Sequence, residues 1–214
     1  MNRPQPFRLE SVGFSIESLR LLQIVHASKS IQMHCKELLE EANRAPKKDK
    51  KTDDGNLSEV KRILYLLRGE EAEANRILLT LAVVVRNGLD QAPLIGRDDQ
   101  LCSVLWEPKT QFEGQPPRPF PETPIQIWKE FQRQNVESTG LGVKDTCNKI
   151  IHAQGVEWSR TETFSSHAIT DTILGRHLDG FVFLYGTRQV KNKESVWICM
   201  LRVDAFCTIS SQLV

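Results

Sequence analysis

Residues 180–203 read GFVFLYGTRQVKNKESVWICMLRV, and they decide the fold class. Two runs rich in β-branched and aromatic residues, 180–186 and 195–203, flank the polar, lysine-containing segment 187–194. Runs of this length and composition are typical of β-strands, and a polar segment between two of them is typical of a hairpin turn. The end of the chain is therefore predicted to contain an antiparallel β-hairpin.

The remainder of the region after residue 153 supports the same interpretation. A third strand is expected near Glu157–Thr163, within VEWSRTETF. Asp204 is a suitable N-cap for a short helix over residues 204–212. We therefore expect residues 154–214 to form a β-rich extension that packs on the preceding helices as one structural unit.

Before this region the hydrophobic residues follow a helical period. Over residues 15–44 they recur mostly three or four positions apart, without Gly or Pro, which predicts a long amphipathic helix. The next segment, APKKDKKTDDGN at 45–56, is predicted to be a solvated loop. Its lysines either keep it soluble or form a basic arm for a phosphate backbone.

Two further helices are expected after this loop. Asn56 is a candidate N-cap, and Glu59 is its partner three residues later. Gly69 is predicted to break or kink the helix that starts there. The pattern resumes over residues 70–89, and this helix should be the most buried one because it contains ILLTLAVVV at 77–85.

Six prolines interrupt residues 92–123, at positions 93, 108, 116, 117, 119 and 121. Proline removes a backbone donor, so the segment is predicted to hold neither a helix nor a central strand. We expect a long ordered loop attached to the helical core by Trp106, Phe112 and Phe120. An alternative use of PPRPFP, residues 116–121, is as a proline-rich ligand for a recognition domain.

The last two helices of the N-terminal part follow this loop. Thr123 is expected to cap a helix that starts at Pro124. Gly140 and Gly142 mark a break, and the next helix should run from residue 141 or 143 to residue 153.

The predicted fold class is therefore α+β. Residues 1–153 are expected to form a helical bundle of about five helices. Residues 154–214 add a small antiparallel hairpin or three-stranded sheet and the short C-terminal helix.

Composition excludes some classes of function but does not identify one. Lys and Arg total 28 against 27 Asp and Glu, so a net charge of +1 gives no overall attraction to nucleic acid. Any contact with RNA would need a local cluster of cations.

The five cysteines form no C-x-x-C pair and are expected to be reduced, buried thiols. With no apolar run after the first basic residues and none long enough to cross a bilayer, we expect a cytoplasmic protein without membrane contact.

The segment most suggestive of chemistry is LGVKDTCNKIIHA, residues 141–153. Opposite the apolar positions of this helix lie four polar residues: Asp145, Asn148, Lys149 and His152. An imidazole titrates near neutral pH and is suited to general acid–base catalysis. Asn148 could orient the ring or a phosphate, and Lys149 could offset negative charge in a transition state. RNA cleavage through its own 2′-hydroxyl needs little more, and neither a metal nor a cofactor is expected.

A structural role for the same face stays open. The helix dipole favours a histidine at a helix C-terminus, whatever its function. His152 is also next to Ile151 and Ala153, so it could be a hydrogen-bonded histidine at the edge of the core.

The string CNKIIHA, in a late helix after several long ones, resembles the motif region of the HEPN superfamily. These small helical bundles occur as RNases and RNA-binding domains in bacterial defence and toxin–antitoxin systems. Their motif is an arginine, a polar residue, a few further residues and a histidine. The resemblance assigns the polar position to Asn148 and the histidine to His152, and it implies a homodimer with the two motifs facing each other.

One position departs from that motif, because Cys147 stands where the family has its arginine. A thiol offers no fixed positive charge for a phosphate. The cation would then have to come from elsewhere, for example from Arg86, Arg160 or Lys149 of either subunit. The other outcome is a fold that binds RNA or protein without cleavage.

Two hypotheses of different class follow. The first is a HEPN-like, metal-independent ribonuclease or RNA-binding protein with RNA and a second copy of the chain as partners. The alternative is a non-enzymatic interaction protein of the immunity or antitoxin kind, with a protein partner, whose motif face is an oligomer contact.

Metal binding by His152, His167 and His177 is disfavoured by their spacing. The aromatics of the C-terminal region are expected to be core residues rather than a platform for RNA bases.

Overall fold

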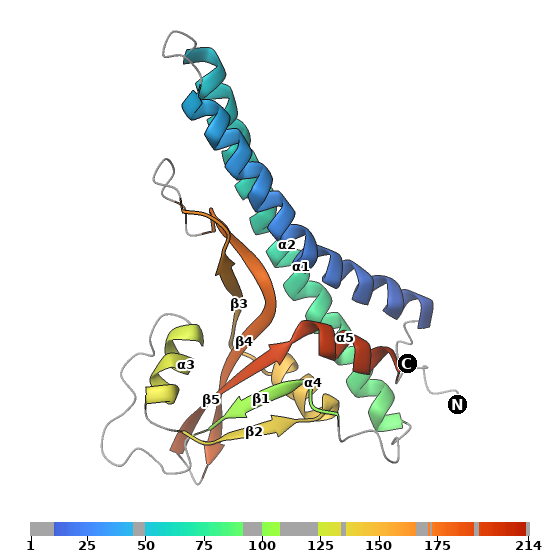
Figure 1. The fold of residues 1–214 in the computed structure, drawn as a ribbon. Coiled ribbons are helices and arrows are strands. Elements are labelled where there is room, and N and C mark those ends of the chain that lie inside the picture. The colour runs from blue at the N-terminus through green and yellow to red at the C-terminus, as the bar shows by residue number, and fades with distance from the viewer. Residues whose placement is uncertain are drawn as a thin grey trace. The chain divides into compact units, whose positions relative to one another are not determined.

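The computed structural model describes residues 11–44, 50–91, 100–107, 124–133, 136–165, 171, 173–190 and 193–212. Within them the chain has an α+β fold, as predicted, with four of the five described helices before Gly155 and a short helix after the last strand (Figure 1). The elements in chain order are α1 (Ser11–Arg44), α2 (Lys50–Gln91), β1 (Ser103–Trp106), α3 (Pro124–Arg133), β2 (Ser138–Leu141), α4 (Val143–Ile151), β3 (Gly155–Glu162), β4 (Arg176–Val190), β5 (Lys193–Arg202) and α5 (Val203–Ser211).

The sheet has five strands in the order β2-β1-β5-β4-β3, two more than expected. The predicted hairpin is present, since β4 and β5 pair antiparallel. The polar segment 187–194 was predicted to be a turn, but most of it continues the two strands, from Thr187 opposite Val196 to Val190 opposite Lys193. The ladder thus continues from the buried strand residues to Arg188 and Gln189, which are exposed.

One of the additional strands corrects the prediction for residues 92–123. β1 pairs antiparallel with β2 on one side and β5 on the other, so it is an interior strand. Its four residues, SVLW, contain no proline, and the nearest prolines flank them at 93 and 108. Phe112, Phe120 and the expected cap Thr123 lie outside the described residues.

The first helices of the chain are fewer and longer than expected. α2 is continuous from Lys50 to Gln91, so the predicted break at Gly69 was wrong. Residues 50–56 of the loop predicted over 45–56 are helical, and residues 45–49 lie outside the described residues. Gly69 is exposed, and a side chain added there would meet nothing. Asn56 does not cap a helix; its amide donates to the Leu38 carbonyl at 3.3 Å.

α5 begins at Val203 after the N-cap residue Arg202, which makes no side-chain cap bond. The predicted cap, Asp204, instead lies in the first turn and accepts a hydrogen bond from Arg202.

No helix within the described ranges is long and apolar enough to span a bilayer.

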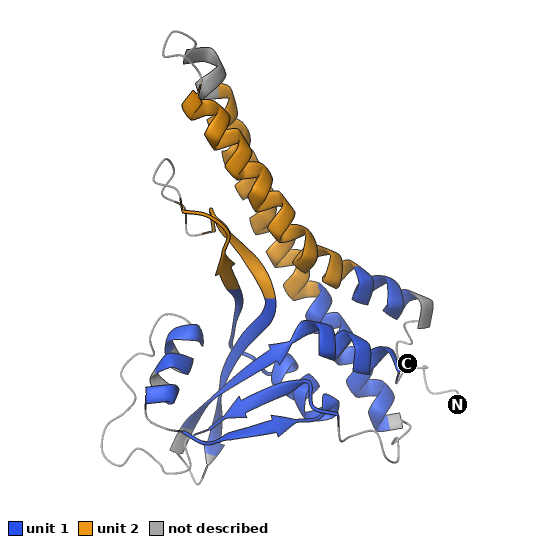
Figure 2. Ribbon diagram, viewed as in Figure 1, with its two compact units in different colours: residues 1–19, 77–159, 180–214 blue, residues 20–76, 160–179 orange. Residues whose placement is uncertain are grey.

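The described chain divides into two compact units (Figure 2). Unit 1 comprises residues 1–19, 77–159 and 180–214, and unit 2 comprises residues 20–76 and 160–179. Each unit thus takes segments from both the helical and the β-rich parts of the sequence.

In unit 1 the sheet is covered on both faces. On one face, Trp128 and Phe131 of α3 pack against side chains that include Trp106, Phe183 and Ile198. On the other face, α4 contacts the sheet, because its Thr146 hydroxyl lies 2.7 Å from that of Ser103. Strand residues alternate between faces, so β1 and β5 supply both layers.

Unit 2 contains the antiparallel pair formed by residues 20–44 of α1 and 50–76 of α2, together with parts of β3 and β4 (Figure 2). Its apolar core is formed by Cys35, Leu39, Val60, Leu64, Leu67, Ile173 and Leu174. These positions recur at helical spacing on α1 and α2, so the two stripes bury each other.

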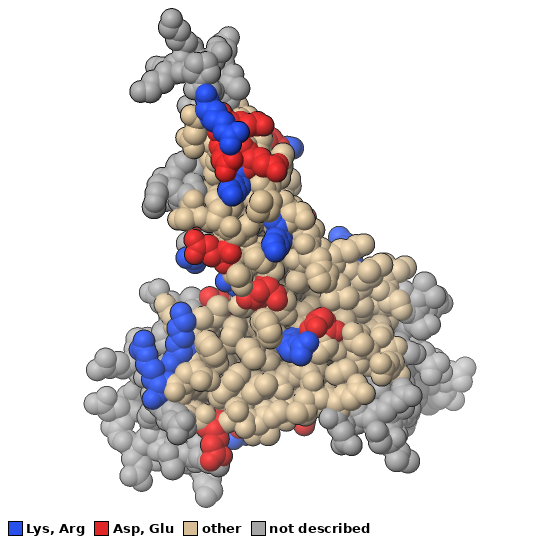
Figure 3. Space-filling model, viewed as in Figure 1, with Lys and Arg blue, Asp and Glu red and all other residues tan. Residues whose placement is uncertain are grey.

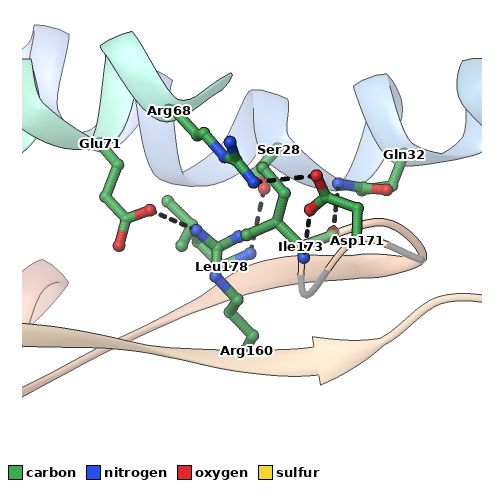
Figure 4. Close-up of polar contacts among 8 residues, drawn as sticks. All are labelled: Ser28, Gln32, Arg68, Glu71, Arg160, Asp171, Ile173 and Leu178. Atoms are coloured by element: carbon green, nitrogen blue, oxygen red, sulfur yellow. Dashed lines mark hydrogen bonds and ion pairs between the residues drawn. The ribbon is translucent and has the colours of Figure 1, made fainter. Parts of the chain in front are cut away.

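Side chains of α1 also hydrogen-bond the backbone of residues 173–178 (Figure 4). The fully buried Gln32 amide donates to the Ile173 carbonyl at 2.9 Å and accepts from the Gly175 N–H at 2.8 Å. One turn earlier, the Ser28 hydroxyl accepts from the Leu178 N–H at 3.0 Å. Gly175 has φ +76, and a Cβ there would collide with the Phe164 carbonyl, so this position requires glycine.

Replacing Gln32 with Ala should lower the free energy of unfolding by about 2–4 kcal/mol, because two buried backbone groups lose their partner. Denaturant unfolding followed by circular dichroism measures this. Gln23 is an exposed glutamine on the same helix, and Gln23→Ala should change the stability by less than about 0.5 kcal/mol. Equal effects of the two variants would contradict a role for the buried amide.

Candidate functional site

The candidate site lies on α4, which buries Val143, Thr146, Cys147 and Ile150 against the rest of unit 1. The helix ends at Ile151, two residues earlier than predicted, and His152 is its C-cap residue. The His152 N–H donates to the Asn148 carbonyl at 3.1 Å, so the two residues share the last turn. The imidazole is exposed, and Asn148 is half-buried.

Asn148 is bound by a cation from another helix. The Nε of Arg86, in the C-terminal part of α2, donates to the Asn148 Oδ1 at 2.8 Å. This guanidinium is only 24% exposed, and it also forms an ion pair with Asp90 one turn later. The structure therefore brings together Arg86, Asn148 and the turn that carries His152.

A second cation reaches the same carboxylate. Lys144, in the first turn of α4, has its Nζ 3.5 Å from the Asp90 Oδ1. The pKa of Asp90 is lowered, chiefly by the hydrogen bond from Arg86 and further by the charges of Arg86 and Lys144. Asp90 is therefore ionised at neutral pH and neutralises one of the two cations.

Lys149 is engaged elsewhere. Its Nζ lies 3.2 Å from the Glu107 Oε1 and 4.4 Å from the centre of the Trp197 ring. The other oxygen of Glu107 accepts from Arg188 at 2.8 Å. Lys149 and Glu107 are each 18% exposed, so this ion pair joins α4 to the sheet. Lys149 thus points away from the face of Asn148, as expected for adjacent residues of a helix.

Asp145, the fourth predicted residue, is exposed in the first turn of α4. A carboxylate in the first turn is stabilised by the helix dipole without any catalytic role. The predicted set of four residues therefore separates into Asn148 and His152 in the last turn, Asp145 in the first turn, and Lys149 toward the sheet.

Cys147 is fully buried, and burial raises the pKa of its thiol to about 12. The nearby Cys102 thiol raises it further, and Arg86 opposes the shift. Position 147 faces the core, where a guanidinium would lose its hydration. A guanidinium at position 147 would therefore lie in the core and not on the face of Asn148.

A buried polar cluster next to Cys147 was not predicted. The Thr146 hydroxyl donates to the Gly142 carbonyl at 2.8 Å and lies 2.7 Å from the Ser103 hydroxyl. The Cys102 thiol is 3.2 Å from the same Thr146 oxygen. All three side chains are buried, so this cluster fixes α4 on β1.

The remaining predicted cations and histidines lie elsewhere. Arg160 forms an ion pair with Glu71 in unit 2 at 2.5 Å (Figure 4). His177 shares a hydrogen bond with Thr163 at 2.6 Å, and His167 lies outside the described residues. Within the described part of the chain, no three His, Cys, Asp or Glu side chains are grouped so as to hold a metal ion.

The aromatic residues of the C-terminal region are mainly core, as predicted. Trp158, Phe183 and Trp197 are buried. Phe183 packs against Trp128 of α3, and the Trp197 ring lies beneath Lys149. They are therefore not available for stacking with RNA bases.

Among the residues of this site, sequence reasoning named Arg86 as one candidate cation but missed Asp90 and Lys144. The spacing of Arg86 and Asp90, four residues apart on a helix, is a signal for an ion pair. No local pattern indicates that α2 meets α4. Comparison of the chain with protein-family models, curated proteins and solved structures finds no match.

The buried thiols give a prediction on reactivity and pH. Burial raises the pKa values of Cys147, Cys199 and Cys207 from 9.0 to about 12. At about pH 8 their thiolate fraction is then on the order of one in ten thousand, so a disulfide reagent should label them very slowly in the folded protein. Absorbance of the released thiolate measures the rate, and guanidinium-unfolded protein is the control.

The same shifts make stability depend on pH. Because the folded-state pKa values exceed the unfolded one, the stabilisation from protonated thiols is complete below pH 9.0 and is lost as the pH rises toward 12. The denaturant midpoint should therefore fall across this window. Fast labelling at about pH 8 without unfolding would show that the thiols are not buried.

Proposed function

We propose that this chain is a HEPN-like protein that binds RNA and cleaves it without a metal ion. The observation that carries the proposal is the bond between Arg86 and Asn148. The motif lacks an arginine at Cys147, and α2 supplies one to the adjacent polar residue at 2.8 Å. The exposed His152 lies in the same helical turn as Asn148.

Each residue has a chemical role in this reaction. The His152 imidazole takes the proton of an RNA 2′-hydroxyl, or returns one to the leaving 5′-oxygen. The 2′-oxygen forms a bond to phosphorus as the bond to the 5′-oxygen breaks. Arg86 offsets the negative charge that develops on the phosphoryl oxygens, and Asn148 holds the guanidinium in position.

The charge distribution is compatible with a local rather than an extended RNA contact. On the face drawn in Figure 3, Lys and Arg side chains are interspersed with Asp and Glu, and neutral atoms cover much of the surface. A protein with a net charge of +1 gains little from the general attraction of a phosphate backbone. Single-stranded RNA held at a few points fits this distribution best.

The biological setting is part of the same proposal. A metal-independent ribonuclease of this kind would act in the cytoplasm, in bacterial defence or as part of a toxin–antitoxin system. A second copy of the chain is the proposed partner, with the two α4 faces opposed.

A second candidate function is protein binding without cleavage. Leu79 and Val83 of α2 are 46% and 39% exposed, and Arg86 follows Val83 by three residues. These three residues therefore lie on one side of the helix. An apolar pair beside an arginine also suits a contact with an immunity-type or antitoxin-type protein, or with a second copy of the chain.

Incubation of the protein with labelled single-stranded RNA in the presence of a chelator tests the proposal. His152→Ala should reduce the cleavage rate on the order of 10²–10⁴-fold, and Arg86→Gln on the order of 10²–10³-fold. His26 is exposed on α1 in unit 2, so His26→Ala should leave the rate unchanged.

Expression of the same variants in bacteria, scored by growth and by RNA integrity, gives a second readout. Loss of toxicity in His152→Ala supports cleavage. If wild type and His152→Ala leave RNA equally intact, the ribonuclease proposal is rejected. A change in sedimentation on Val83→Asp would then favour the contact function.

A further inference from the structure

The two charged residues beside Arg86, Asp90 and Lys144, each lie at the helix end that disfavours their charge. Asp90 is the penultimate residue of α2, where the helix dipole disfavours a carboxylate. Lys144 is the second residue of α4, where the dipole disfavours a cation. The local helix dipoles therefore stabilise neither residue. Asp90 is stabilised by Arg86 and Lys144, and Lys144 is stabilised by Asp90.

The guanidinium of Arg86 is held by one partner and faces an anion with another nitrogen. Its Nε is fixed by the Asn148 Oδ1 at 2.8 Å, and a terminal nitrogen faces the Asp90 carboxylate. A guanidinium fork matches a carboxylate and a phosphate equally well. Lys144 approaches the same carboxylate at 3.5 Å and adds a second positive charge.

We infer that Arg86 and Lys144 form a binding site for one phosphate group of an RNA backbone, and that Asp90 occupies this site in the absence of RNA. The inference rests on the proposed function and adds to it the point at which the substrate is held. Asp90 acts as an internal competitor that the phosphate displaces.

Exposure makes this exchange feasible. The Asp90 side chain is 50% exposed and that of Lys144 is 44% exposed, so the carboxylate regains water when it leaves. Arg86 is 24% exposed and keeps its bond to Asn148, so the guanidinium stays in place for the incoming anion. Arg86 and Lys144 retain one net positive charge with either anion, so replacing Asp90 by a phosphate monoanion leaves the charge of the pair of cations and its bound anion unchanged.

The matched control is another carboxylate of the same unit. Asp204 pairs with Arg202 at 2.9 Å in the first turn of α5, with side chains 61% and 57% exposed. Asp204→Asn and Asp90→Asn remove the same charge from the protein. Any difference between them reports on the position of Asp90 rather than on net charge.

The test is titration of the full chain with inorganic phosphate, followed by NMR of the arginine Nε–H groups, in wild type and variants at low salt. Asp90→Asn should bind phosphate about two- to fivefold more tightly than wild type, a range set by the small energy of an exposed ion pair. Asp204→Asn should match wild type, and Lys144→Gln should bind more weakly. If Asp90→Asn binds no more tightly than Asp204→Asn, the inference is wrong.

Labelled single-stranded RNA in a parallel binding and cleavage assay separates this inference from the proposed function. Tighter phosphate binding by Asp90→Asn without any retention or cleavage of RNA would keep the anion site and reject the ribonuclease proposal. RNA cleavage that depends on His152, together with unchanged phosphate binding in Asp90→Asn, would keep the ribonuclease and reject the anion site.

Discussion

The constraint on which the candidate site depends is the burial of both faces of the sheet in unit 1. Along β5, Val196, Ile198 and Met200 face the layer that contains α3, and Trp197 contacts Lys149 of α4 on the opposite side. This alternation follows from strand geometry. Because one face is filled by α3, α4 has to lie on the other, and there its Thr146 is joined to Ser103. The position of Asn148 follows from this packing.

The sequence predicts the local elements of this arrangement better than their connections. The hydrophobic pattern places the helix with Asn148 and His152 within two residues of its actual end, because that pattern reports directly on burial. Gly69 is misleading because the penalty of a helical glycine is only about 1 kcal/mol, and burial of Leu67 and Ala74 on either side outweighs it. The four-residue strands β1 and β2 are too short for a periodic signal.

Cys147 shows why position 147 could not present a cation on the face of Asn148. Its side chain is fully buried, and its thiol stays protonated because burial raises the pKa to about 12. A core position cannot hold a solvated guanidinium, so an arginine there would require different packing of α4. The contact of Arg86 with Asn148 spans 62 residues of sequence. A separation of this kind leaves no trace in local spacing, whereas the proximity of Asn148 and His152 is set by the helix itself.

The Gln32 amide does for residues 173–175 what a neighbouring strand would do. It accepts from one backbone N–H and donates to one backbone carbonyl, as a peptide group in a ladder does. Ser28 extends this pairing to the N–H of Leu178. Backbone groups that point away from a sheet can otherwise recruit strands from other molecules. These two buried polar side chains of α1 therefore protect this segment against edge-to-edge aggregation, which hydrophobic packing alone would not do.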